Sequence, residues 1–220
     1  MSFFENTRKP VGFSGKIMVA MMNFGHSAMA AWGLHFLQLA PDAMVLDCGC
    51  GGGANIKTLL KLCPKGKVQG IDYSAVSVEK ARKVNAGAIA AGQCTVQQAS
   101  VAELPFEAEQ FDVVTAFETV YFWPELAQNF REVYQVLKPG GRMYMVHRPH
   151  RLIEILGTMK QYKLEPKRMK MVHPFKDKDA NMVLIEAVRG GGAWMKVEAP
   201  VIVYKEPGVY TDEIYSIYGY

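Results

Sequence analysis

Glycines and carboxylates alternate in one short segment that follows an apolar run. In Val45–Gly53, Asp47 ends the apolar pair, and glycines then recur at every second position. Glycine lets the backbone turn tightly and approach a ligand without interference from a Cβ atom. A helix is expected to begin near Ala54, directly after this turn. The segment therefore predicts a buried parallel strand and a loop that holds a nucleotide-type cofactor.

A second acid strengthens this prediction. Asp72 ends the next apolar run, Lys67–Ile71, and an acid at the end of a second strand can accept hydrogen bonds from both ribose hydroxyls. A dinucleotide needs a free helix N-terminus for its pyrophosphate, whereas a carboxylate at Asp47 favours a cofactor that carries an ammonium group. The two acids thus indicate S-adenosylmethionine rather than NAD.

These motifs form part of an ordered set, which consists of Val45–Gly53, Gly70–Ser74, Glu103–Phe106, Phe111–Val114 and Leu137–Gly141. In this order they resemble the motifs of class I S-adenosylmethionine-dependent methyltransferases. Strand ends and turns of another doubly wound sheet would explain each motif separately, but not the set. The resemblance implies an α/β fold with a Rossmann-like, seven-stranded, mostly parallel sheet, helices on both faces and an N-terminal helical lid.

The resemblance also implies a cofactor site. The expected contacts are Asp47, Gly49, Cys50 and Gly51 at the methionine end, Asp72 at the ribose, Tyr73 and Ser74 beside the adenine, and Ser100 and Val101 near the adenine ring and its amine. Ser100 departs from the family, which usually has an acid at this position to contact the adenine amine. This change predicts weaker recognition of the adenine.

The residues after the fourth strand are expected to face the methyl group. The resemblance places the carbonyl of Phe117 and the side chain of Glu118 over the sulfur and amino group of the cofactor. Glu118 would orient cofactor or acceptor, or it would simply be satisfied by a nearby helix N-terminus. Tyr121 begins an aromatic run that either lines an acceptor pocket or packs in the core. His26 is the candidate base by resemblance, because the N-terminal helices of such enzymes form a lid.

The resemblance changes midway along the chain. Residues 1–141 resemble small-molecule-type bacterial methyltransferases, whereas residues 142–220 resemble the C-terminal half of tRNA adenine-N6 methyltransferases that act on a valine tRNA. The second resemblance depends on Val146–Pro149, Leu164–Arg168 and Ala180–Glu186. A join at 137–142 would keep the strand order intact, so the chain is predicted to be a chimera.

The join leaves three functions open. The tRNA enzymes carry an Asn-Pro-Pro-Tyr motif that holds the flipped adenine, but this chain has Phe117–Tyr121 at that place. The first prediction is therefore a methyltransferase for a small molecule. The alternatives are an RNA base methyltransferase and a hybrid that only binds cofactor.

An RNA partner is suggested by the segment 142–178, which has ten basic and three acidic residues and a net charge of +7. The rest of the chain sums to −3, since the whole carries +4. Such a segment faces an anionic partner or is a solvated surface that keeps the protein in solution. Composition alone favours the second interpretation.

Composition places the chain among globular proteins. It has 220 residues, half of them apolar, which is enough for one domain with a sizeable core. We expect a helical lid at 1–40, a cofactor domain at 41–190 and a tail packed on it at 191–220. Residues 1–10 lack the apolar core of a signal peptide, which predicts a cytoplasmic protein with four reduced cysteines and no metal site. Polar residues such as Asn23 and His35 interrupt the apolar stretch 17–39, so no membrane contact is expected, and no feature indicates an oligomeric state.

The elements that must position these residues alternate along the chain, as in a parallel sheet covered by helices. Strands are expected at 44–48, 68–72, 94–98, 111–117, 142–147, 168–173 and 181–188. Helices are expected at 17–23, 27–39, 54–62, 77–91, 123–136 and 151–162. The irregularly spaced tyrosines of the tail are expected to pack on the domain.

Overall fold

A computed structural model describes residues 27–123 and 125–219 of the chain. Its helices are α3 (Ser27–Phe36), α4 (Ala54–Leu62), α5 (Ala75–Val84), α6 (Ala86–Ala90), α7 (Leu126–Val136), α8 (Leu152–Gln161) and α9 (Asp212–Tyr218), with the short 3₁₀ turns η1 (Val120–Phe122) and η2 (Pro149–Arg151). Its strands are β1 (Met44–Cys48), β2 (Lys67–Asp72), β3 (Cys94–Gln98), β4 (Phe111–Phe117), β5 (Leu137–His147), β6 (Leu164–His173), β7 (Met182–Arg189), β8 (Lys196–Val197), β9 (Val201–Ile202), β10 (Tyr204–Glu206) and β11 (Val209–Tyr210).

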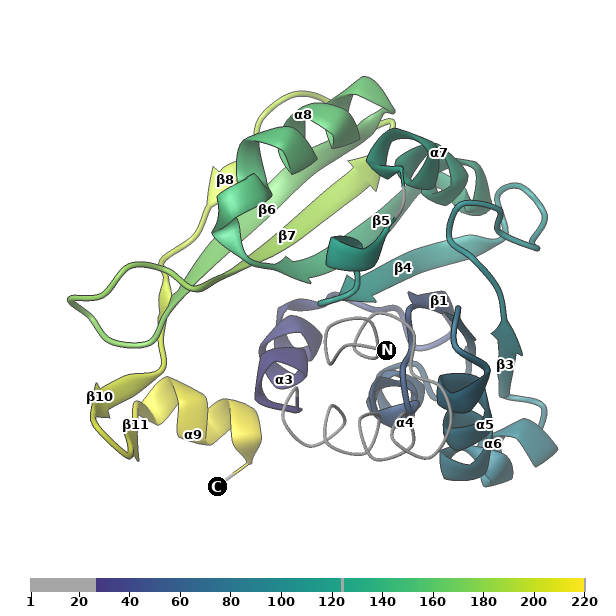
Figure 1. Cartoon of the computed structure of the whole chain (residues 1–220), viewed down its shortest axis with the longest axis horizontal. Helices are drawn as coiled ribbons and strands as arrows, with labels where there is room; N and C mark the ends of the chain where they lie inside the picture. Colours follow the sequence, from purple (N-terminus) through teal and green to yellow (C-terminus); the bar gives the residue numbers. More distant parts are fainter. Residues whose placement is uncertain (1–26, 124, 220) are drawn as a thin grey trace, which may run out of the picture.

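One sheet forms the centre of the molecule, with the strand order β3-β2-β1-β4-β5-β7-β6-β8 and β9 beside β6 (Figure 1). Strands β1 to β5 run parallel, and β7 is antiparallel to both β5 and β6. The chain leaves β1 toward β2 on one side and returns to β4 on the other. Ligands of open α/β sheets bind at such a switch point, outside the carboxyl ends of the strands.

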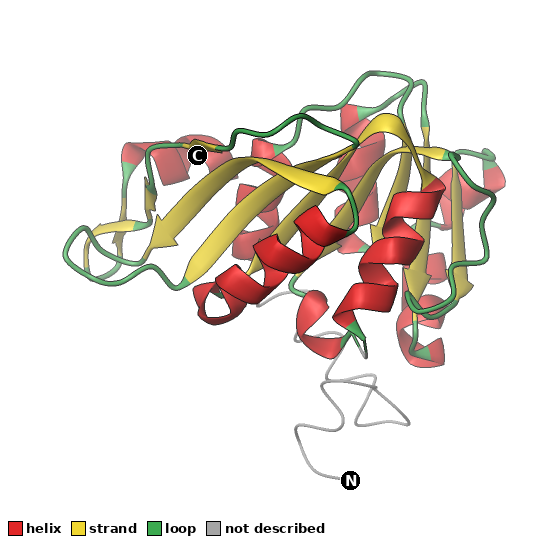
Figure 2. Cartoon of the chain, turned by 90° about the horizontal axis from the view of Figure 1, so that it is seen from above, coloured by secondary structure: helices red, strands yellow, loops and turns green. Residues whose placement is uncertain are grey.

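Helices cover both faces of this sheet (Figure 2). Successive side chains of a strand point to opposite faces, so Val45 of β1 joins the core under α3, α4 and α5, whereas Leu46 joins the core under α7 and α8. In β4 every residue except Asp112 is buried, which fits a central strand that is covered on both sides. The layered α/β fold expected from the sequence is confirmed.

The seven expected strands are all present, and the differences have local causes. The helix expected at 77–91 divides at Asn85 into α5 and α6, because the Asn85 side chain donates to the carbonyl of Ala81 and caps the first piece. The helix expected at 123–136 starts at Leu126, since Trp123 precedes a proline and is extended. β5 starts at Leu137, which pairs with Phe111 of β4.

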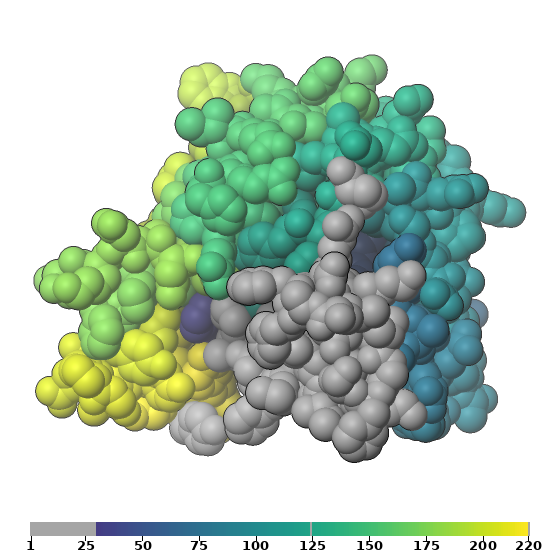
Figure 3. Space-filling view, viewed as in Figure 1, coloured from purple at the N-terminus to yellow at the C-terminus, as the bar shows by residue number. Residues whose placement is uncertain are grey.

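The tail adds elements that the sequence did not predict. The short strands β8 and β9 extend the sheet beside β6, and β10 and β11 form a hairpin. Tyr204 and Tyr210 stack with ring centroids 5.1 Å apart, and Tyr218 meets Tyr210 edge to face at 5.3 Å. These three tyrosines therefore pack against one another within the tail. In the space-filling view the C-terminal residues, in yellow, lie against the green residues that precede them in the chain (Figure 3).

Three carboxylates outside the basic segment neutralise part of its charge. Glu186 of β7 binds both Arg142 and Arg168, and Arg168 also donates to Glu198 at 2.8 Å. Lys170 lies 3.4 Å from Glu213 of α9. The arginines and lysines of 142–178 therefore contribute to the packing of the sheet as well as to its surface charge.

Within residues 27–123 and 125–219, the helices are too short or too polar to cross a lipid bilayer.

Candidate active site

The glycine loop runs from the carboxyl end of β1 to α4 and contacts the carboxyl end of β2. The backbone N–H groups of Gly49 and Cys50 both donate to the carbonyl of Ile71, at 2.8 and 2.9 Å. Gly49 and Gly51 have φ angles of 78° and 53°, in the left-handed region that favours glycine. The predicted loop thus forms, and it is fixed by backbone bonds to the second strand.

The Asp72 carboxylate holds this loop through hydrogen bonds to the backbone. Its Oδ2 accepts from the N–H of Gly51 at 2.9 Å, and its Oδ1 accepts from the N–H of Ser74 at 2.8 Å. Burial raises the pKa of Asp72, and the hydrogen bonds from the backbone of Ser74 and Gly51 and from the side chain of Ser77 oppose the rise. A carboxylate has about four acceptor sites, so Asp72 keeps the capacity to accept from a hydroxyl of a ligand. Its orientation is set by the chain before any ligand binds.

Asp47 is the second carboxylate, and it is 1% exposed. Its Oδ1 accepts from the hydroxyl of Thr115 at 2.8 Å, while Oδ2 has no hydrogen-bond partner among the described residues. Burial raises the pKa of Asp47 to about 6, the Thr115 hydroxyl opposes the rise, and the charge of Asp72 adds to it. A buried carboxylate without a cation is costly, so the position favours a positively charged ligand.

The cysteines of the loop do not act as nucleophiles here. Cys48 and Cys50 are buried and free. Burial, followed by the charge of Asp47, raises the pKa of the Cys50 thiol well above its usual range. Both thiols therefore stay protonated and pack as small apolar groups. Among the described residues no cluster of histidine, cysteine and acidic side chains has the arrangement of a metal site.

Asn85 supports the loop from the end of α5, a role that sequence reasoning missed. Its Nδ2 donates to the carbonyl of Gly53 at 2.9 Å, and the residue is 3% exposed. Gly53 is the residue from which α4 begins. The only sequence signal was an asparagine inside an expected helix, which is more typical of a cap than of a helix interior.

The end of β4 lies beside the loop. Glu118 has a φ angle of 57°, and its N–H donates to the carbonyl of Val146 in β5 at 2.9 Å. The hydroxyl of Thr119 donates to the carbonyl of Cys48 at 2.9 Å. The Phe117 ring is buried and faces Gly33 of α3. Two hydrogen bonds thus fix Phe117 and Glu118 between β1 and β5.

Tyr121 and His147 meet at the same edge of the sheet. Their ring centroids lie 4.1 Å apart. Burial, followed by the charge of Glu118, raises the pKa of Tyr121 to about 12, so the phenol stays protonated at neutral pH. His147 ends β5 and is fully buried. No local sequence pattern links His147 to its neighbour Tyr121, which is 26 positions away in the chain.

The other predicted contacts lie near the end of β3 or outside the description. Ala99 donates to the carbonyl of Asp72 at 3.1 Å, which brings Ser100 and Val101 to the adjacent strand end. The Ser100 hydroxyl accepts from the N–H of Ala102 at 3.2 Å, and Val101 packs against the core. Tyr73 is 55% exposed. His26, the candidate base, lies outside the described residues.

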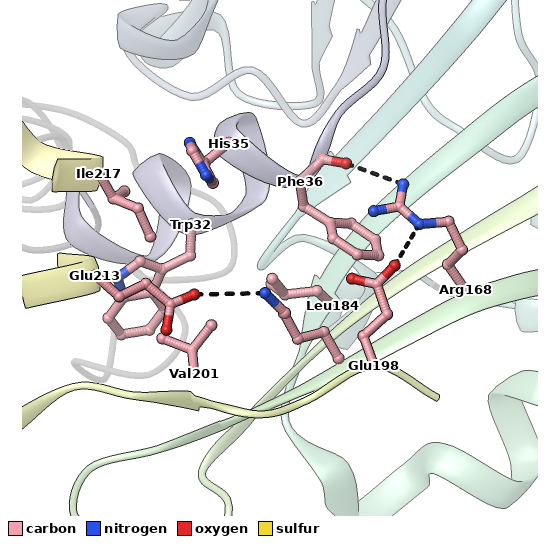
Figure 4. Close-up of a pocket in the computed structure, with 10 residues that line it drawn as sticks. Trp32, His35, Phe36, Arg168, Leu184, Glu198, Val201, Glu213 and Ile217 are labelled. Carbon is pink, nitrogen blue, oxygen red and sulfur yellow. Dashed lines mark hydrogen bonds and ion pairs between the residues drawn. The ribbon is translucent and has the colours of Figure 1, made fainter. Parts of the chain in front are cut away.

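A cavity of about 150 Å³ lies under α3, away from the glycine loop (Figure 4). Its charged lining residues pair with one another or with their surroundings: Arg168 binds Glu198 and the carbonyl of Phe36, and Lys170 binds Glu213. The charged side chains of this cavity are therefore already engaged in contacts with the protein. The strand ends around Asp47 and Asp72 are the better candidate for chemistry.

Two glycine substitutions should separate the folding of the loop from its binding. A Cβ at Gly49 would lie 2.4 Å from Cγ2 of Thr119, whereas a Cβ at Gly51 would meet no described atom within 4 Å. Gly49→Ala is expected to lower the free energy of unfolding by about 2 kcal/mol or more through this clash. Gly51→Ala should cost about 1 kcal/mol of backbone strain, but place a methyl group in the ligand's space and weaken binding. Urea unfolding and calorimetry measure both effects, and equal stability of the two variants would contradict the expectation.

Comparison with known proteins adds the following. Residues 46–145 match the family model of the methyltransferase domain, which includes the predicted join at 137–142. The chain is 35% identical over 108 residues to the demethylmenaquinone methyltransferase of Lactiplantibacillus plantarum, which covers 49% of this chain and 46% of that protein. The chain spans about half or less of the length of the curated relatives it matches.

Solved structures extend the likeness beyond residue 145. A predicted O-methyltransferase from Agrobacterium tumefaciens superposes with a TM-score of 0.72 at 20% identity, over 87% of this chain and 95% of that one. A geranyl diphosphate C-methyltransferase from Streptomyces coelicolor, in complex with Mg²⁺, geranyl diphosphate and S-adenosyl-L-homocysteine, gives a TM-score of 0.64 at 19% identity, over 82% and 86%. At this identity the likeness concerns the fold.

Proposed function

Because residues 46–145 match the family model of the methyltransferase domain, we propose that the protein is an S-adenosylmethionine-dependent methyltransferase that acts on a small molecule. One observation carries the proposal: the buried carboxylate of Asp47 and the half-buried carboxylate of Asp72 lie at a glycine loop that has no basic side chain between residues 47 and 54. Such a loop suits a nucleoside cofactor with a positive charge. It does not suit the phosphates of a dinucleotide.

The residues present fit this cofactor. Asp72, already oriented by Gly51 and Ser74, accepts from the two ribose hydroxyls. Asp47 presents a buried Oδ2 without a described partner, which receives the ammonium group of the methionine end. The open space over Gly51 leaves room for the chain between these two ends. Tyr73 and Ser74, together with Ser100 and Val101, adjoin the adenine.

The side chains around the site then have to align the acceptor with the methyl group of the cofactor. The bound cofactor supplies a methyl group on a sulfonium, which transfers by in-line displacement without any nucleophile from the protein. Glu118 is held by its bond to Val146 and orients the acceptor opposite the loop. Phe117 and Tyr121 close the sides of the site and exclude water. We keep the N-terminal residues as the proposed lid, with His26 as its candidate base.

A small acceptor is supported by the names of the similar proteins, which act on demethylmenaquinone and geranyl diphosphate. The ion pairs of Arg142, Arg168 and Lys170 weaken the case for RNA, because these cations are already engaged by carboxylates. The acceptor class therefore follows from the site after β4 and β5, and the basic segment serves mainly the fold. We propose that the protein is located in the cytoplasm.

Cofactor affinity is expected to fall about tenfold between pH 7 and pH 5, because Asp47 must be ionised to hold a cation and its pKa is about 6. Asp72, whose pKa burial also raises, acts in the same direction. Calorimetry with S-adenosylmethionine at both pH values measures the change. In Asp47→Asn the affinity should be lower at pH 7 and should vary less with pH.

Asp47 also makes the stability of the free protein depend on pH. A rise in pH strengthens cofactor binding but lowers this stability. Between the usual pKa of 3.8 and about 6, the folded protein without cofactor binds more protons at Asp47 than the unfolded chain does. The Asp47 contribution therefore makes the free protein less stable as pH rises through this window. Asp47→Asn should raise the melting temperature of the free protein at pH 7. A wild type that binds S-adenosylmethionine equally at pH 5 and pH 7 would contradict the prediction on affinity, and an Asp47→Asn protein that melts below the wild type at pH 7 would contradict the prediction on stability.

Calorimetry of the wild-type protein tests the proposed function directly. S-adenosylmethionine and S-adenosylhomocysteine should bind, and NAD⁺ should not. The demethylated product lacks the sulfonium charge but keeps the ribose and the ammonium group, so it reports on both acids. Failure of S-adenosylhomocysteine to bind at pH 7, or preferred binding of NAD⁺, would overturn the proposal.

A further inference from the structure

One imidazole nitrogen at the candidate site is buried and has no hydrogen-bond partner among the described residues. Nε2 of His147 has no hydrogen-bond partner within the described part of the chain, although the residue is fully buried. Nδ1 lies 2.7 Å from the carbonyl oxygen of Arg148. A carbonyl oxygen can only accept, so Nδ1 carries the proton and Nε2 presents a lone pair. The structure thus fixes one tautomer of a neutral histidine.

Nε2 of His147 lies near the ends of β4 and β5. His147 ends β5 beside the end of β4, and the hydrogen bond between Glu118 and Val146 joins the two strand ends. The ring of Tyr121 packs against the imidazole. An unpaired buried acceptor destabilises the folded protein, and native structures retain such groups where they serve a ligand or a reaction. This edge is also where the proposed cofactor and acceptor meet.

The surroundings keep His147 neutral. Burial lowers its pKa, and His150 and Arg151 lower it further, while the bond to the Arg148 carbonyl and the charge of Glu118 oppose this. The groups that face it come from three segments: Glu118 and Tyr121 after β4, Arg148, His150 and Arg151 after β5, and Glu154 in α8. At neutral pH the net result is an unprotonated imidazole, which is the form that can accept a proton.

We propose that Nε2 of His147 accepts the proton of the methyl acceptor, and that the acceptor reacts through a hydroxyl group. A hydroxyl loses its proton above neutral pH in water and gains most from a fixed base. In the transfer, a bond forms between the acceptor oxygen and the methyl carbon while the carbon–sulfur bond of the donor breaks. The sulfonium charge is neutralised, and the hydroxyl proton moves to Nε2, from which it returns to water. The inference rests on the proposed function.

The tautomer can be tested without knowing the natural acceptor. In protein labelled with ¹⁵N in its histidines and loaded with S-adenosylhomocysteine, His147 should give the signals of a neutral ring protonated at Nδ1 at pH 7. Comparison with His147→Asn assigns the signals. A ring protonated at Nε2, or at both nitrogens, would overturn the inference.

Methylation rates test the role of His147 as a base. Hydroquinone is the probe that carries a hydroxyl group, and nicotinamide is a planar probe whose ring nitrogen bears no proton. His147→Asn keeps a donor for the Arg148 carbonyl but lacks Nε2, and it should methylate hydroquinone about 100-fold or more slowly, chiefly in kcat. His150→Gln, at the exposed neighbour, should stay within about threefold of the wild type.

The outcomes are distinguishable from those of the proposed function. A His147→Asn rate within threefold of the wild type would overturn the inference, as would a wild type that methylates only nicotinamide or neither probe. A loss confined to His26→Gln would assign the base to the N-terminal segment instead. In each of these cases, calorimetric binding of S-adenosylhomocysteine would leave the proposed cofactor chemistry standing.

Discussion

Asp72→Asn is expected to bind S-adenosylhomocysteine about 100-fold more weakly than the wild type, with a fold that survives the change. Each hydrogen bond from a ribose hydroxyl to a charged acceptor contributes about 1.5 to 3 kcal/mol, so the loss of charge toward two hydroxyls accounts for the factor. Asparagine also has one acceptor oxygen where the N–H groups of Gly51 and Ser74 now use two. Isothermal titration calorimetry at pH 7 measures the effect.

Asp112→Asn provides the matched control for this variant. Asp112 lies near the start of β4, where it accepts from the N–H of Met44 at 2.9 Å and binds Lys138. It is a partly buried aspartate at the opposite end of the strands, so its loss should leave cofactor affinity within about twofold. Equal affinities of Asp72→Asn and the wild type would exclude Asp72 as the ribose ligand.

Glu186→Ala is expected to destabilise the protein by about 3 to 5 kcal/mol, the largest effect on folding that we predict. The Glu186 side chain is 1% exposed and binds Arg142 of β5 and Arg168 of β6 across its own strand. Removing it leaves two guanidinium groups close together without their shared carboxylate. For a chain of this size the melting temperature should fall on the order of 10 °C, which calorimetric scanning measures.

Lys138→Ala provides the comparison for a pair on the surface. Lys138 and Asp112 form an ion pair at 2.7 Å, but both side chains are well exposed, at 42% and 38%. Such a pair contributes about 0 to 1 kcal/mol. If the Glu186→Ala and Lys138→Ala proteins melted at the same temperature, the buried network would not be a determinant of stability.

The fold could be predicted from the sequence because its strands are short apolar runs between clear turn signals. β1, β3 and β4 have the predicted boundaries. The two-residue strands β8 and β9 were missed, since they exist only through their pairing with β6 and carry no periodic pattern of their own. The length of a strand therefore decides whether its sequence reveals it.

The cofactor side of the site was accessible for a related reason. Asp47 and Asp72 each end a strand, and parallel strands bring their ends to one edge, so spacing along the chain carries the geometry. Asn85 and His147 were not accessible, because their importance depends on contacts with Gly53 and Tyr121 that no local pattern encodes. Their types, a helix-ending asparagine and a strand-ending histidine, are informative only once the partner is known.

The basic segment shows the limit of charge counting. Its excess of +7 suggested a surface for an anionic partner. The structure places Glu186 between two of its arginines and Glu213 beside Lys170. Both acids lie outside the segment, so a window along the sequence counts the cations and omits their counterions.

The contact between α3 and α9 has a consequence for how the molecule assembles. These helices, Ser27–Phe36 and Asp212–Tyr218, pack together although more than 170 residues separate them. On the ribosome, α3 is synthesised long before its partner, and contacts so distant in sequence form late because closing the intervening loop costs entropy. The sheet and its glycine loop can therefore condense first, and the layer that contains α3 reaches its final position only after residues 212–218 are available.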